Sequence, residues 1–236
     1  MAKPEVTKFN HTIIDPIFYM LTATSILCAL LIVVRSFQVD YVRFQFLLWN
    51  LFLAWLPLIV SISALWLTRI VKGGTLAIGL TLFGIAWLLL YPNAPYLTTD
   101  FIHLIYNPGF QVYNPEGLLL WYDLVLFFLF SWCGLLLGFL SMRHFHSIVS
   151  HYINGWSGWV FVLIVSFLGG FGVYLGRVVR LNSWDVLSPF RLIEGVIEGI
   201  NAKSAIFTML FGMLILIIYC SLYLLGQNKA RKARSL

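Results

Sequence analysis

The sequence predicts an all-α fold, a polytopic membrane helix bundle of about six transmembrane helices in one domain over residues 1–236. The chain is 61% hydrophobic and only 10% charged, whereas a soluble domain carries about 25% charged residues. Its charged residues are separated by long apolar stretches. The strict alternation of apolar and polar residues that is typical of membrane barrels is missing. A bilayer accommodates such a surface, whereas in water it would aggregate.

Each long apolar stretch predicts one membrane span. A helix needs about 20 apolar residues to cross about 30 Å of hydrocarbon, and in lipid it satisfies its own backbone hydrogen bonds. The predicted spans cover approximately residues 17–34, 46–67, 74–91, 121–141, 157–176 and 205–225. Lys3 and Lys8 precede the first span, but no small-residue cleavage site follows it, so we expect a retained helix.

Two segments between the spans are also expected to be helical. Pro95 suits a first helical turn and predicts a short outer-face helix over 95–106. Ser188 and Pro189 open a second helix over 188–201. Its apolar residues share one face: Phe190, Ile193, Val196, Ile197 and Ile200. We expect this amphipathic helix to lie in the membrane interface, and the alternative is a lid packed on the bundle.

Glycine spacing in the fifth span predicts close packing. Gly172 and Gly176 form a GxxxG pattern, which permits a helix to approach its neighbour closely. This is a packing signal and indicates no activity.

The distribution of Lys and Arg predicts the orientation. Of the 15 Lys and Arg residues, nine fall on the side of the two termini and six on the other, and residues 92–120 contain none. By the positive-inside rule, both termini and a basic tail over 226–236 are expected to be cytoplasmic, at the plasma membrane. The net charge of +6 follows from these clusters, and no basic stripe with interleaved aromatic residues indicates nucleic-acid binding.

The segment after the third span contains candidate catalytic residues. On an α-helix Tyr96, Asp100 and His103 share one face, so Asp100 could orient His103 as a general base. Asp123 is a candidate second carboxylate that faces His103 or an arginine. The structural alternative is a stripe that faces water or caps neighbouring helices, with Asp123 stabilising a helix N-terminus. With one histidine in this region, we expect no metal site, and no cofactor is indicated.

A second group of polar residues follows the fifth span. Arg177 and Arg180 are three residues apart and would project from one helix face, where two guanidinium groups suit phosphate or carboxylate. The alternatives are an ion pair with a nearby Asp and snorkelling to the headgroups. The further candidate substrate-binding residues are Asn50, Asn93, Tyr96, Asn182 and Asp185.

Several sequence strings resemble a known family. They are Trp49-Asn50-Leu51-Phe52-Leu53-Ala54-Trp55, Tyr91-Pro92-Asn93-Ala94-Pro95-Tyr96 with Thr99-Asp100 and His103, Trp121-Tyr122-Asp123, and Gly176-Arg177 with Asn182-Ser183-Trp184-Asp185. Together they are similar to the bacterial integral-membrane family catalogued as domain of unknown function 1361. The resemblance extends from the second span to the sixth. It implies a multi-pass bacterial membrane protein and no established activity.

Three functions remain open from the sequence. The first is a structural or accessory subunit of the cell envelope, which packs against another membrane protein. The second is an outer-face enzyme or binder that acts on an anionic or lipid-linked phosphorylated molecule. The third is a small-solute transporter, although the spans hold no ionisable residue near their centres and show no inverted repeat. Whether the chain is an enzyme is not determined by any motif.

Overall fold

The computed structural model describes residues 16–37, 44–105, 118–181, 185 and 188–234. All regular elements among these residues are helical, and six stretches are long and apolar enough to cross a membrane. Each stretch starts with one long helix, and in chain order these helices are α1 (Pro16–Phe37), α2 (Gln45–Ile70), α3 (Gly74–Leu90), α6 (Leu118–Tyr152), α7 (Gly155–Tyr174) and α9 (Ala202–Arg234). The predicted all-α bundle of six spans is therefore confirmed.

Two helices extend well beyond the predicted spans. With 35 residues, α6 is about 52 Å long at 1.5 Å per residue, far more than the hydrocarbon thickness. Likewise α9 continues to Arg234 and so includes most of the predicted basic tail. The reason is that charged residues end an apolar stretch without ending a helix, since Lys and Arg are good helix formers.

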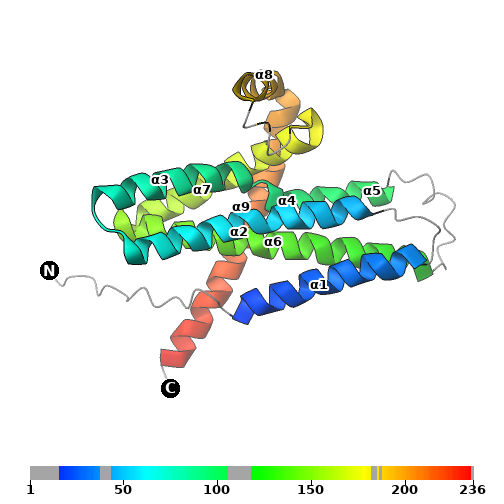
Figure 1. Cartoon of the computed structure of the whole chain (residues 1–236), viewed down its shortest axis with the longest axis horizontal. Coiled ribbons are helices and arrows are strands. Elements are labelled where there is room, and N and C mark those ends of the chain that lie inside the picture. Colours follow the sequence, from blue (N-terminus) through cyan, green and yellow to red (C-terminus); the bar gives the residue numbers. More distant parts are fainter. Residues whose placement is uncertain (1–15, 38–43, 106–117, 182–184, 186–187, 235–236) are drawn as a thin grey trace.

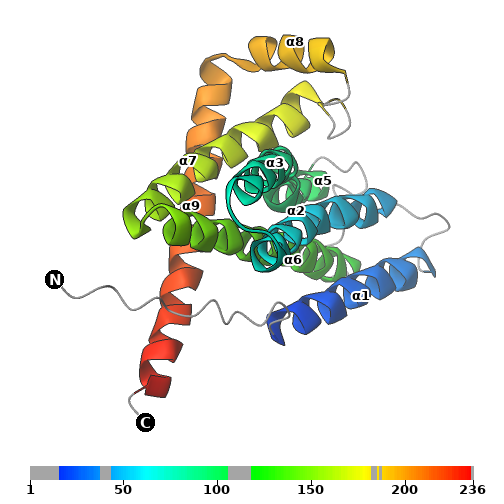
Figure 2. The ribbon, with the colours of Figure 1, turned by 60° about the vertical axis from the view of Figure 1, so that its left-hand side comes forward.

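The arrangement places α6 at the centre of the bundle (Figure 1). It contacts α1, α2, α7 and α9, whereas the most extensive contact of α7 is with α9. In both views α9 crosses the other helices, and its C-terminal part extends away from them (Figure 2). Toward its middle, α2 continues through Pro57 without interruption.

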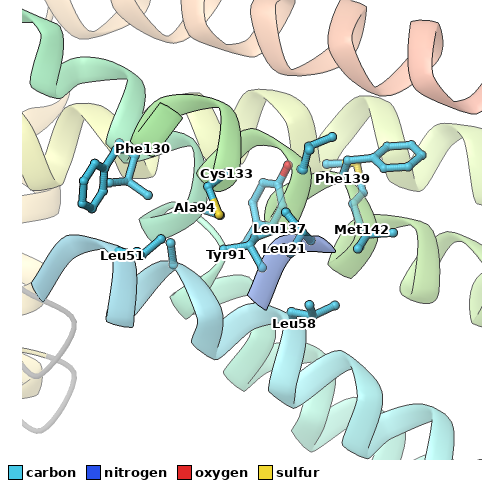
Figure 3. Packing of buried hydrophobic residues seen from close by; sticks show 14 of the residues in the cluster. Leu21, Leu51, Leu58, Tyr91, Ala94, Phe130, Cys133, Leu137, Phe139 and Met142 are labelled. Atoms are coloured by element: carbon cyan, nitrogen blue, oxygen red, sulfur yellow. The ribbon is translucent and has the colours of Figure 1, made fainter. Parts of the chain in front are cut away.

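Apolar side chains from α1, α2 and α6 form the packed interior (Figure 3). Leu21, Leu58 and Leu137 are almost completely buried there. Because lipid tails are as apolar as leucine, close packing and polar contacts hold membrane helices together more than exclusion from water does. The few polar contacts between spans are therefore informative.

The third span continues past its predicted end. After Tyr91 and Pro92 the chain forms α4 (Asn93–Tyr96), the 3-10 helix η1 (Leu97–Phe101) and α5 (Ile102–Ile105). These pieces correspond to the short helix predicted over 95–106, whose last residue lies outside the described part. They lie alongside α2 and α6 (Figure 1), and Ala94, Leu97 and Asp100 are fully buried.

Glycines make room for this segment on two neighbouring helices. A Cβ atom at Gly134 of α6 would lie 2.5 Å from the carbonyl oxygen of Ala94, and one at Gly172 of α7 would collide with the Pro92 ring. Neither position tolerates a side chain without movement of its neighbour. The stretch from Tyr91 to Leu97 therefore lies between α6 and α7.

The predicted GxxxG pattern has a different partner from an ordinary helix pair. Gly172 adjoins Pro92 and Gly176 adjoins Tyr96, so the pattern accommodates the end of the third span. The close approach of α7 to α9 occurs at Gly170, whose Cβ would lie 2.8 Å from the backbone nitrogen of Gly212.

The amphipathic helix forms as α8 (Pro189–Gly199) and lies at the edge of the molecule (Figure 2). Its glycine side packs on the chain, because a Cβ atom at Gly195 would lie 2.9 Å from Leu181. Its apolar side, with Ile193 and Ile197, is exposed. A lid would bury that apolar side against the bundle, so the orientation favours the interfacial helix over the lid.

Candidate functional site

Asp100 is the centre of the most connected group of polar side chains. Its carboxylate is fully buried. One oxygen accepts a hydrogen bond of 2.9 Å from Nδ2 of Asn50 on α2. The other lies 3.2 Å from Nη1 of Arg177. A buried charge is tolerated when it is paired and hydrogen-bonded in this way.

The guanidinium group of Arg177 makes further hydrogen bonds with the same segment. Nη1 also donates to the hydroxyl of Tyr96 at 3.0 Å, and Nη2 donates to the carbonyl oxygen of Thr99 at 2.9 Å. The guanidinium carbon lies 5.3 Å from the centre of the Tyr96 ring, a cation–π distance. Asn50, Tyr96, Thr99, Asp100 and Arg177 form what we term the Asp100 network, which joins the second, third and fifth spans.

Two of the three residues of the predicted stripe meet. Tyr96 and Asp100 both contact Nη1 of Arg177. His103, which follows the 3-10 helix η1, is not part of that contact.

His103 is exposed and separate from the Asp100 network. Its ring lies 4.7 Å from the ring of Phe46. Within the described residues, it makes no hydrogen bond to Asp100. The arrangement in which Asp100 orients His103 as a base is therefore not formed in this structure.

A second buried ion pair joins the first and fourth spans. Nε of Arg35 lies 2.6 Å from one oxygen of Asp123, and Nη2 lies 3.0 Å from the other. Both side chains are buried, and the guanidinium also lies 5.9 Å from the centre of the Phe44 ring. Asp123 was expected to face His103 or an arginine, and its partner is an arginine.

Arg35 takes part in this buried ion pair but is missing from the candidate site residues that the sequence predicts. A usable signal was present, because Arg35 ends the first span and Asp123 begins the fourth. A cation and a carboxylate at the same end of neighbouring spans are candidates for an ion pair.

Further polar contacts hold α1 against its neighbours. The hydroxyl of Tyr122 donates to the carbonyl oxygen of Leu31 at 2.6 Å. Nε1 of Trp55 donates to Oγ of Ser25 at 3.1 Å, and that hydroxyl lies 3.4 Å from Sγ of Cys133. These contacts matter because α1 is one of the least buried spans.

The remaining predicted site residues are Arg180, Asn93, Asp185 and Asn182. Arg180 is exposed and adopts a left-handed φ of 64° where the π-helix η2 (Leu175–Val179) ends. That change of helix type separates its side chain from Arg177. Asn93 is half-buried and Asp185 is buried. Asn182 lies outside the described residues.

The geometry supports joining of helices better than reaction chemistry. Asp100 and Asp123 are buried, and each is held by a guanidinium group. A general base must reach the proton that it abstracts. Among the residues that the structure describes, no three His, Cys, Asp or Glu side chains gather as metal ligands.

Comparison with known proteins gives one assignment. No curated protein and no solved structure matches the chain. The model of one family, described as Protein of unknown function (DUF1361), matches residues 49–218. This match includes all five residues of the Asp100 network and Asp123 of the second ion pair, whereas Arg35 lies outside it. The chain belongs to the DUF1361 family.

Proposed function

We propose that this chain is a structural or accessory subunit of the bacterial plasma membrane, where it packs against a partner membrane protein. The observation that carries the proposal is the closure of the Asp100 network. Asp100 is fully buried, and both of its oxygens already accept hydrogen bonds from Asn50 and Arg177. Such satisfied networks fix one packing arrangement of the spans.

The proposal includes the predicted orientation, with both termini in the cytoplasm. The support is the excess of Lys and Arg on the side of the termini. In that orientation the Asp100 network and the Arg35–Asp123 pair lie toward the outer face. There they lock the outer ends of the spans that a partner contacts.

A second candidate function is an outer-face binder of an anionic or lipid-linked phosphorylated molecule. Arg180 favours it, since its side chain is exposed and makes no hydrogen bond or ion pair with the described residues. The same side chain would be a simple headgroup contact if the structural role holds.

Substitution of Arg177 or of Arg180, which are three residues apart, distinguishes the two candidate functions. Full-length protein with Arg177→Gln or Arg180→Gln is purified from native membranes after cross-linking, and bound proteins and lipids are quantified by mass spectrometry. A structural role predicts a stoichiometric partner that is lost with Arg177→Gln and retained with Arg180→Gln. Both variants remove one positive charge, so each is the control for the other.

The opposite pattern would overturn the structural proposal. It consists of a stoichiometric phosphorylated lipid that is lost with Arg180→Gln, together with no partner protein in the unaltered chain. A partner that binds both variants equally would also contradict the role given to the Asp100 network.

A further inference from the structure

An open cleft of about 240 Å³ lies between the later parts of α6 and α9. It is distant from the Arg35–Asp123 pair. Arg143, which lines the cleft, follows Asp123 by 20 positions on the same helix, and at 1.5 Å per residue this places the two residues about 30 Å apart.

That spacing sets the depth of the cleft in a bilayer. The hydrocarbon core is about 30 Å thick, so if Asp123 lies at one boundary, Arg143 lies at the other. The α9 side of the cleft, which includes Tyr223, just precedes the basic Lys229. The cleft therefore opens at the level of the headgroups, on the side that the predicted orientation assigns to the cytoplasm.

One face of α6 lines the cleft with hydrogen-bond donors. Arg143, Ser147 and Ser150 follow one another at helical spacing and all line it. Arg143 is half-buried, yet its guanidinium makes no hydrogen bond or ion pair with the residues that the structure describes. A guanidinium group with free donors, flanked by two hydroxyls, suits a phosphate group.

The remaining walls suit an amphiphilic ligand. Phe139 and Leu222 line the cleft toward the apolar parts of their helices. His146 is fixed by a 2.6 Å contact between its Nδ1 and the hydroxyl of Tyr219. The cleft thus combines an apolar side with a polar side at the depth where lipid tails meet headgroups.

We infer that this cleft binds a phosphate group, carried by an anionic phospholipid or present as free phosphate, with Arg143 as its main cation. This site is additional to the proposed subunit role and does not depend on it. The acyl chains of a lipid would follow Phe139 and Leu222 toward the hydrocarbon.

The test uses delipidated full-length protein in detergent. Phosphatidylglycerol, phosphatidylcholine and inorganic phosphate are titrated separately, and binding is measured by native mass spectrometry for the lipids and by thermal shift for phosphate. We expect phosphatidylglycerol to bind at least about tenfold more tightly than phosphatidylcholine, because a hydrogen-bonded charge pair contributes about that factor.

Arg143→Gln should remove that preference. The matched control is Lys72→Gln, which removes an exposed cation outside the cleft. A lone cation near an anionic membrane surface contributes about fivefold, so an effect of Lys72→Gln as large as that of Arg143→Gln would contradict a specific site.

A second variant guards against misfolding of the first. Gly226 lines the cleft, and a Cβ atom there would meet no atom within 4 Å. Gly226→Leu fills the space while improving helix propensity, so it should abolish phosphatidylglycerol binding without lowering the melting temperature. Gly226→Ala should retain binding.

The outcomes are distinct. Phosphatidylglycerol binding that both Arg143→Gln and Gly226→Leu reduce supports a lipid headgroup. Binding of inorganic phosphate alone, reduced by the same variants, supports a free anion. Absence of both kinds of binding, or binding that neither variant alters, would overturn the inference.

Discussion

Arg177 lies 3.2 Å from Asp100, and each residue also has partners that the other lacks. Asn50 completes the coordination of the carboxylate, while Tyr96 and Thr99 complete that of the guanidinium. The pair thus joins three spans at once. Loss of either residue leaves the other one buried without its charge partner, which lowers the stability of the fold.

Removing one member of this pair should destabilise the protein. Asp100→Asn and Arg177→Gln should each lower the free energy of unfolding by about 3 kcal/mol, at the lower end of the range for buried pairs because Arg177 retains some exposure. The measurement is chemical unfolding of the full-length protein in detergent, followed by tryptophan fluorescence. Arg180→Gln, the matched control, should change the value by less than about 0.5 kcal/mol. Equal losses in Arg177→Gln and Arg180→Gln would contradict the special role of the pair.

Loss of Arg35 should loosen α1. Arg35→Met leaves Asp123 buried without its guanidinium partner, and a loss of only about 1.4 kcal/mol in the docking of α1 already corresponds to tenfold more frequent opening. Thiol labelling followed by peptide mass spectrometry measures this opening. Cys28 and Cys133, both buried, should react at least about tenfold faster, whereas Cys220 on α9 should not. Faster labelling of all three cysteines would indicate general unfolding instead.

Gly134→Ala should be destabilising although alanine favours helices. The added Cβ would lie 2.5 Å from the carbonyl oxygen of Ala94, and such overpacking costs about 1–3 kcal/mol. Gly226→Ala is the control, because its Cβ meets no atom within 4 Å and the substitution should be neutral or stabilising by up to about 1 kcal/mol. Thermal unfolding of both variants checks the prediction, and a stable Gly134→Ala protein would refute the close contact.

The two sides of α8 should differ in their contact with lipid. A spin label at Ile193→Cys, on the exposed apolar side, should be accessible to dissolved oxygen in bilayer discs. The same label at Glu198→Cys should be accessible to a water-soluble relaxation agent. Power-saturation spectroscopy of each variant, with the native cysteines replaced, makes the comparison. Two water-exposed labels would show that the helix does not lie in the interface.

Much of the fold follows from the spacing of charged residues. Six apolar stretches predict six spans because hydrocarbon admits few charges, and the described part of the chain contains six such helices. The ends of α6 and α9 were less predictable, since a helix continues into water wherever its residues favour it. The exposed apolar side of α8 also agrees with the sequence pattern.

The sequence predicted the residues of the candidate site better than it predicted which of them contact one another. Asp100, Tyr96, Asn50 and Arg177 were all expected site residues, and an Asp–Arg pair was an open alternative. Residues 97–101 form a 3-10 helix, which a periodicity argument that assumes an α-helix throughout does not detect, and the ring of His103 lies against Phe46. The pairing of Arg35 with Asp123 depends on which spans are neighbours, and sequence spacing alone does not supply that information.

The stretch from Tyr91 to Leu97 lies between the glycines of α6 and α7. It therefore relates the order of the helices along the chain to the order in which they pack. The surface that receives α7 includes Pro92 and Tyr96, and it is completed only when Ala94 and Leu97 are seated against α6. In turn, α7 presents Gly170 to Gly212 of α9. Because synthesis delivers the N-terminal helices first, each late helix finds its docking surface already built.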